Sequence, residues 1–230
     1  MKSSVIDYVQ DELRGLADPE KAVSMQAYLK TDMPFYGVQA KDRARIFREI
    51  KARYAPAEEA EYVELACALW ELPHREEKYL AVAVAGGFAQ YVVPGSLPFY
   101  RRLIVEGAWW DLVDDVAVHI IRRLVLTYPN ETWPMIDGWN EDENLWLRRT
   151  SIICQVGAKE RTDQERLFRF CEARIGEKDF FIRKAIGWAL REYAKTKPEE
   201  VAGFVAAHRN DMAGLSFREA TKHIEHLVAG

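Results

Sequence analysis

The chain has 230 residues, of which 49% are hydrophobic and 30% are charged. This balance is typical of globular proteins and excludes a disordered chain, and the length is sufficient for one sizeable core. The formal net charge of −4 gives no general attraction to a polyanion such as DNA. Any nucleic-acid function must therefore depend on a local basic segment.

The amino-terminal segment is amphipathic and carries acidic residues, so it lacks the apolar region of a secretory signal. The three cysteines, Cys67, Cys154 and Cys171, are far apart and form no paired motif for zinc or redox chemistry. We expect them to be small buried residues of a protein in a reducing compartment, which predicts a cytoplasmic location.

Apolar residues recur at three- and four-residue spacing along almost the whole chain, for example over residues 113–124 and 182–190. This periodicity is typical of amphipathic helices, and no segment alternates as a strand would. Nine prolines divide the pattern into segments of helix or helix-pair length. The sequence predicts an all-α protein with a single domain over residues 1–230.

Residues 79–100 contain no charged side chain, which raises the question of a membrane span. Glycines at 86 and 87 and prolines at 94 and 98 interrupt the segment. Its alanine-rich apolar part is also shorter than the roughly 20 residues that a bilayer requires. We expect a buried helix followed by a turn.

A weak internal repeat is present in the second half of the chain. Residues 144–149 align with residues 179–184 at an offset of 35, and Trp110 lies 36 residues before Trp146. Each copy begins a helix with aromatic residues, followed by charges and an apolar stripe. A period in this range favours stacked helix pairs of the HEAT or TPR type. Such stacking gives an α-solenoid, whose concave surface we expect to bind an elongated ligand.

Basic residues gather in one part of the chain. Residues 144–197 contain 13 Lys and Arg against 7 Asp and Glu, whereas the flanking segments are acidic. Within this block Lys184, Trp188, Arg191 and Lys195 recur at helical spacing. A cationic stripe interrupted by an indole suits phosphate binding with aromatic packing. The alternative is a solvated helix face with Trp188 buried.

Residues 109–115 place two indoles and three carboxylates at the start of an apolar helix. On a helix Trp110 and Asp114 are one turn apart on the same face. A carboxylate beside an aromatic wall suits a positively charged group. In the alternative interpretation Asp111 caps the helix, Asp114 and Asp115 are solvated, and both tryptophans belong to the core.

Other chemistry has little support in the sequence. His223 and His226 lie one turn apart, but no third ligand with clear spacing completes a metal site. The glycine pair at 86 and 87 lacks the pattern of a phosphate-binding loop. We expect neither a metal nor a cofactor.

Several of these blocks, taken together and in this order, resemble the AlkD-type alkylpurine DNA glycosylases, a family of HEAT-like repeat proteins. The Trp-Trp-Asp and Ile-Gly-Trp blocks are the most specific in combination. The matching stretches span nearly the whole chain and are residues 34–38, 69–73, 109–114, 144–149, 184–195 and 215–224.

The resemblance implies a role for individual residues. Asp114 would be the catalytic carboxylate, with Trp110 and Trp188 as the two indoles that cradle the deoxyribose. Arg149 would contact the DNA backbone, and Tyr28 would lie near the lesion. The matching and basic segments add further candidate DNA contacts, namely Arg148, Lys184, Arg191, Lys195 and Lys222.

The resemblance also implies a cytoplasmic monomer, associated with the nucleoid when acting, that needs no metal or cofactor. It would hydrolyse the N-glycosidic bond of N3- or N7-alkylated purines in duplex DNA without base flipping. Two alternatives remain, a non-catalytic relative that binds nucleic acid and a HEAT-like scaffold for another protein. The enzyme requires Trp110, Asp114, Arg149 and Trp188 to converge on one concave surface. A scaffold instead predicts Asp114 in a structural salt bridge and an exposed apolar groove.

Overall fold

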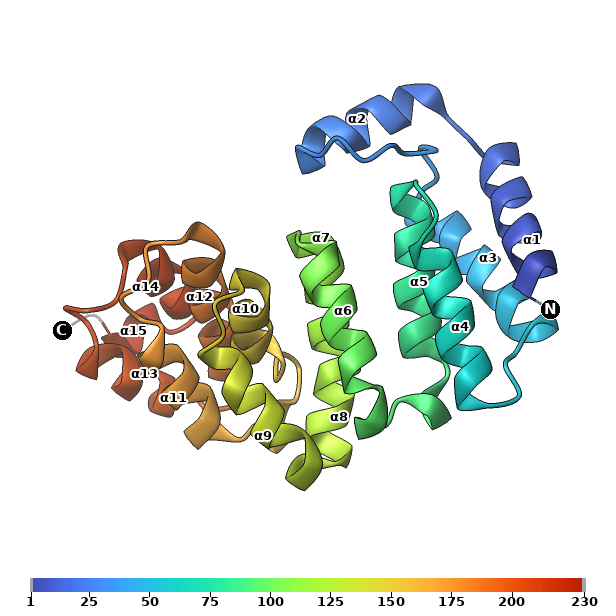
Figure 1. Cartoon of the computed structure of the whole chain (residues 1–230). Coiled ribbons are helices and arrows are strands. Elements are labelled where there is room, and N and C mark those ends of the chain that lie inside the picture. Colours follow the sequence, from blue (N-terminus) through green and yellow to red (C-terminus); the bar gives the residue numbers. More distant parts are fainter. Residues whose placement is uncertain (1, 229–230) are drawn as a thin grey trace. The chain divides into compact units, whose positions relative to one another are not determined.

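The computed structural model describes residues 2–228, with side chains from residue 4 onward. Every regular element within that range is helical, and no strand occurs in it (Figure 1). The chain is therefore an all-α protein of stacked helices with an α-solenoid-like fold, as the apolar periodicity predicted. It forms two compact units, one ending at Val92 and the other beginning at Val93.

The first unit is built on packing among its longer helices. Helix α5 packs against α4 and α3, and α1 packs against both α3 and α4. Apolar side chains of these helices are fully buried, among them Leu13, Ile50 and Leu80. The elements of this unit are α1 (Lys2–Gly15), α2 (Pro19–Leu29), α3 (Ala40–Arg53), α4 (Glu59–Trp70), α5 (Arg75–Gly87) and the short 3₁₀ helix η1 (Ala89–Tyr91).

The uncharged segment 79–100 is a buried helix followed by turns, as predicted. Helix α5 ends at Gly87, and two short 3₁₀ helices follow before the next α-helix begins at Leu97. Among residues 2–228, no helix has the length and hydropathy needed to cross a membrane.

A buried carboxylate fixes the loop that leads from α2 to α3. Glu76, in the first turn of α5, is fully buried and accepts hydrogen bonds from the backbone N–H groups of Tyr36, Gly37 and Val38, at 3.0, 2.8 and 3.0 Å. Gly37 has a φ of +85°, and a Cβ there would lie 2.1 Å from the carbonyl oxygen of Asp18. The tight approach of this loop to α2 therefore requires glycine.

In the second unit α10 has a central position, since it packs against α7, α9 and α12, while α12 packs closely on α14. The elements are η2 (Pro94–Ser96), α6 (Leu97–Gly107), α7 (Trp110–Asp115), the π-helix η3 (Val116–Ile121), α8 (Arg122–Thr127), α9 (Pro129–Asn140), α10 (Leu145–Ile153), η4 (Lys159–Arg161), α11 (Gln164–Ala173), α12 (Phe180–Ala194), α13 (Pro198–Ala207), α14 (Gly214–Thr221) and α15 (Glu225–Val228).

The aligned copies of the repeat begin two helices with the same type of cap. Asn144 accepts hydrogen bonds from the N–H groups of Trp146 and Leu147 at the start of α10. Asp179 accepts the equivalent bonds from the first turn of α12. These side chains satisfy N–H groups that have no partner within the helix. The internal repeat is thus a structural one.

The cysteines are buried as the sequence predicted. Cys154 and Cys171 are fully enclosed and Cys67 is partly so, and all three are free thiols. Burial raises the pKa of the Cys154 and Cys171 thiols well above the ordinary value, so neither forms a thiolate at neutral pH.

The carboxylate of Glu76 gives a first testable prediction. In Glu76→Gln the amide has one acceptor oxygen and directs a donor toward three N–H donors, so at least one buried N–H loses its acceptor. We expect a loss of about 1–3 kcal/mol in the free energy of unfolding, measured by urea denaturation. Glu172→Gln, a change at an exposed position, is the control, and equal stability of the two variants would contradict the prediction.

Candidate active site

Asp114 and Arg149 form a buried, bidentate ion pair. The Nε of Arg149 donates to Oδ1 of Asp114 and its Nη2 donates to Oδ2, both at 2.7 Å. The remaining Nη1 donates to the backbone carbonyl of Phe181 at 2.6 Å. Because Asp114 lies on α7, Arg149 on α10 and Phe181 on α12, one guanidinium joins three helices.

The two partners differ in their exposure. Only 6% of the Arg149 side chain is exposed, against 17% for Asp114. Burial raises the pKa of the Asp114 carboxyl above its ordinary value, although the hydrogen bonds and charge of Arg149 oppose the shift. Each carboxylate oxygen accepts one hydrogen bond from Arg149 and retains a second lone pair. Asp114 is thus held in place while a small part of its side chain stays exposed.

Three aromatic rings form a cluster, and one of them lies near the guanidinium. The ring centroids of Trp109, Trp146 and Phe181 lie 4.9 to 6.1 Å apart. The Cζ of Arg149 is 6.0 Å from the Phe181 centroid. Trp109, Trp146 and Phe181 were not among the predicted site residues, although the aromatic residues at the start of each repeat copy were a signal for them.

The two indoles expected to cradle the sugar are both partly exposed. Trp110 is the first residue of α7, one turn before Asp114, and Trp188 lies about two turns beyond Phe181 on α12. Trp109 and Trp110 are both partly buried, and Trp109 packs against Trp146 and Phe181, so the core interpretation holds in part for Trp109.

The carboxylates of this motif occupy three different environments. The N-cap position of α7 is Trp109 rather than Asp111, so Asp111 does not cap the helix. Asp115 is half-exposed and lies 3.3 Å from His119. Asp114 is largely buried and paired with Arg149, so the description of Asp114 as a solvated acid is also wrong.

Four cations of the expected DNA-binding set are held by carboxylates within the protein. Arg148 lies 3.0 Å from Glu177 and also donates to two backbone carbonyls. Lys195 is paired with Glu192 at 2.7 Å. The other two, Lys184 and Arg191, share Glu219. The basic segment is therefore largely neutralised by the fold, and the predicted contacts of these cations with DNA stay predictions.

Two further candidate contacts are exposed. Tyr28 lies on α2 in the first unit with 74% of its surface exposed, and Lys222 follows the last residue of α14. His223 and His226 are also exposed, and the residues from 2 to 228 contain no group of three side chains able to hold a metal ion. The roles proposed for Tyr28 and Lys222 remain predictions.

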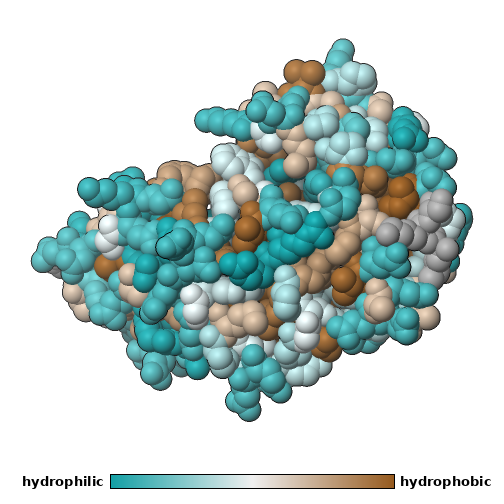
Figure 2. All heavy atoms as spheres, viewed as in Figure 1, coloured by the Kyte–Doolittle hydropathy of each residue, from teal (hydrophilic) through white to brown (hydrophobic). Residues whose placement is uncertain are grey.

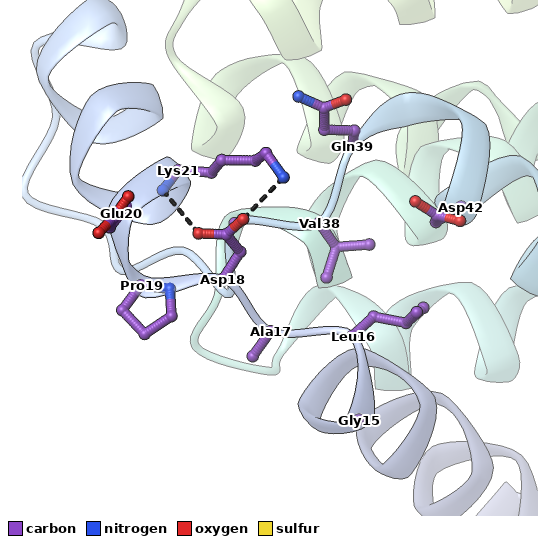
Figure 3. Close-up of a pocket in the computed structure, with 11 residues that line it drawn as sticks. Gly15, Leu16, Ala17, Asp18, Pro19, Glu20, Lys21, Val38, Gln39 and Asp42 are labelled. Atoms are coloured by element: carbon purple, nitrogen blue, oxygen red, sulfur yellow. Dashed lines mark hydrogen bonds and ion pairs between the residues drawn. The ribbon is translucent and has the colours of Figure 1, made fainter.

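The first unit contains a pocket away from these residues. It has a volume of about 600 Å³ and opens between the end of α1 and the starts of α2 and α3 (Figure 3). Asp18 in its wall accepts a hydrogen bond from the backbone N–H of Lys21 and pairs with the ammonium group of Lys21 at 2.7 Å. These groups satisfy one another at the start of α2, so the pocket offers no arrangement comparable to that around Asp114.

Comparison with known proteins assigns the family. The sequence model of the DNA alkylation repair enzyme family matches residues 9–224. The chain belongs to this family. Among solved structures, a protein of Enterococcus faecalis described as a predicted DNA alkylation repair enzyme is similar, with 27% identity and a TM-score of 0.84 over 90% of this chain and 96% of that one.

A second similar structure supports the fold alone. It is smu.31 from Streptococcus mutans UA159, with 18% identity and a TM-score of 0.61 over 80% of this chain and 98% of the other. A comparison with curated proteins gave no match. A role in DNA alkylation repair is thus established at the level of the family.

The ion pair predicts a specific dependence of stability on pH. In Arg149→Met the Asp114 carboxylate is buried without a counter-charge, which we expect to cost about 3–5 kcal/mol and to raise its pKa further. A carboxyl whose pKa is higher in the folded protein than in the unfolded chain binds more protons when folded. The stability of Arg149→Met should therefore fall, relative to the parent, as the pH rises through that pKa.

Thermal melts of the parent and Arg149→Met at acidic and neutral pH provide the measurement. The double variant Asp114→Asn/Arg149→Met, which removes both charges, should recover part of the loss. Equal stability of the single and double variants at neutral pH would contradict the interpretation of Asp114 as an uncompensated charge.

Proposed function

We propose that the protein is an alkylpurine DNA glycosylase that hydrolyses the N-glycosidic bond of N3- or N7-alkylated purines in duplex DNA. The observation that carries the proposal is the position of Asp114, an anchored carboxylate one helical turn from Trp110. In this proposal the enzyme works as a monomer in the cytoplasm, without a metal or cofactor and without base flipping.

The substrate class fits this chemistry. An N3- or N7-alkylated purine is already cationic and is a good leaving group, so little protonation is needed. As the bond to C1′ breaks, positive charge develops on the sugar, as in the oxocarbenium-like transition state of glycoside hydrolysis. A fixed carboxylate beside that sugar lowers the barrier, and it can also orient the attacking water.

Arg149 has a different role in this proposal from the DNA-backbone contact that the resemblance implied. All three of its guanidinium nitrogens donate to groups of the protein, and 94% of the side chain is hidden from solvent. We therefore assign Arg149 as a positioning residue that orients Asp114 and favours its ionised form. The orientation is set before substrate binds, which is the condition for effective electrostatic stabilisation.

The same ion pair also favours the alternative of a HEAT-like scaffold, since a structural salt bridge at Asp114 was the arrangement expected of a scaffold. That scaffold was also expected to expose an apolar groove. On the face drawn in Figure 2, hydrophobic residues are interspersed among hydrophilic ones over most of the surface. Activity of the parent protein and its loss in a variant at Asp114 distinguish the two functions.

We expect Asp114→Asn to lower the excision rate by about 10²–10³-fold while retaining binding to duplex DNA, because one preorganised electrostatic group is lost. The measurement is release of base from duplex DNA carrying a single N7-methylguanine, under single-turnover conditions. Asp115→Asn makes the same chemical change one residue away, at a half-exposed position, and should keep the parent rate.

The outcomes separate the hypotheses. Near-normal excision by Asp114→Asn would exclude Asp114 as the catalytic group. No release by either protein, together with salt-sensitive DNA binding, would identify a non-catalytic DNA-binding relative. A thermal melt of Asp114→Asn checks that the loss of the bond to Arg149 has not unfolded the protein.

The excision rate should also depend on pH. The protonated carboxyl carries no negative charge, so we expect the rate to fall as the pH is lowered through the pKa of Asp114. Because burial raises that pKa, the decline should begin above the ordinary value of 3.8. Rates corrected for spontaneous base loss test this, and a rate that is constant down to pH 3.8 would contradict the role of the carboxylate.

A further inference from the structure

We propose that Lys184 and Arg191 form a binding site for a DNA phosphate, and that Glu219 occupies this site when undamaged DNA is bound. The Nζ of Lys184 lies 2.8 Å from Oε1 of Glu219, and Nη1 of Arg191 donates to Oε2 of the same carboxylate. The inference rests on the proposed function for the identity of its ligand, duplex DNA.

The two cations bracket one oxyanion. Each oxygen of the Glu219 carboxylate is held by a different cation, an arrangement that the non-bridging oxygens of a phosphate can also satisfy. Two cations against one carboxylate leave an excess of positive charge at the cluster. The hydrogen bond and charge of Lys184, with the charge of Arg191, lower the pKa of Glu219, so it stays ionised at neutral pH.

The cluster lies beside a candidate site residue. Lys184, Trp188 and Arg191 are spaced by four and three residues on α12, so they share one face of the helix. Cations that flank an exposed part of an indole are suited to a sugar-phosphate backbone. This favours DNA over a simple anion as the ligand of the site.

Close packing of helices fixes Glu219 in this position. A Cβ at position 187 would lie 2.5 Å from the Cβ of Glu219 and 3.0 Å from the carbonyl oxygen of Ser216. Gly187 therefore allows α14 to approach α12 closely enough for Glu219 to reach both cations. A carboxylate held in this way competes with phosphate at a high effective concentration.

The cluster is partly open to solvent. The side chain of Lys184 is 39% exposed, while those of Arg191 and Glu219 are 21% and 23% exposed. Because all three side chains reach solvent, a phosphate of bound DNA can approach the cations and replace the carboxylate. The internal competitor lowers the affinity for undamaged DNA by occupying two cations that would otherwise contribute to it.

The test measures the affinity of the protein for undamaged duplex DNA by fluorescence anisotropy over a range of salt concentrations. In Glu219→Gln the two cations are released, and we expect tighter binding with a salt dependence that is steeper by about 1 to 2 in the slope of log K against log salt. Glu172→Gln changes the net charge by the same amount at an exposed position away from the cluster. It should leave the slope close to that of the parent.

A double-mutant cycle keeps the test informative. Lys184→Gln/Arg191→Gln should change the slope less in the parent than in the Glu219→Gln background, because Glu219 holds both cations in the parent. A thermal melt of each variant shows whether it is folded. If Glu219→Gln does not fold, Lys184→Gln/Arg191→Gln in the parent background provides the test. A decrease of about 2 in the slope of log K against log salt there would mean that both cations already contact DNA in the parent, and it would overturn the proposal.

Two other outcomes overturn it as well. One is an unchanged slope in folded Glu219→Gln, and the other is an equal change in Glu172→Gln. The measurement uses undamaged DNA and requires no turnover. Its result is therefore distinguishable from a failure of the base-release assay, which tests the glycosylase activity itself.

Discussion

The arrangement of the candidate site depends on the buried ion pair between Asp114 and Arg149. Two charges removed from water are tolerated only when their hydrogen-bonding groups are satisfied, and here the guanidinium donates to both carboxylate oxygens and to the Phe181 carbonyl. These bonds set the positions of α7 and α12 relative to α10. The bonds that orient Asp114 are thus also part of what holds the helices together.

A second ion pair with the same sequence spacing links neighbouring repeats. Asp114 and Arg149 are 35 residues apart, and so are Lys184 and Glu219, while residue 184 is the repeat equivalent of residue 149. Each cation therefore pairs with an acid on a neighbouring repeat. The acids come from the segments that flank the basic block, Asp114 from before it and Glu219 from after it. The basic block in the sequence is consequently in large part a structural feature, and only a part of it is available to a ligand.

The sequence determined the class of the fold and the starts of the repeat helices. Apolar spacing predicted an all-α chain because burial of one helix face is a local consequence of residue order. Asn144 and Asp179 act as caps, since a capping side chain needs only N–H groups two or three residues away. The blocks around Asp114 and Trp188 also indicated the family, which the match over residues 9–224 established.

Tertiary structure decided which charges are available. From the sequence alone Arg149, Lys184 and Arg191 were all candidates for DNA contacts. Asp114 was an acid with a catalytic role, a solvated position or a place in a structural salt bridge. Pairing across 28 to 35 residues distinguishes these groups. No local signal in the sequence marks the backbone carbonyl of Phe181 or the carboxylate of Glu219 as a partner. The environment of an ionisable side chain depends on charges that packing brings close to it. The sequence therefore gives the kind of side chain at each position, but not its burial, its partner or its pKa.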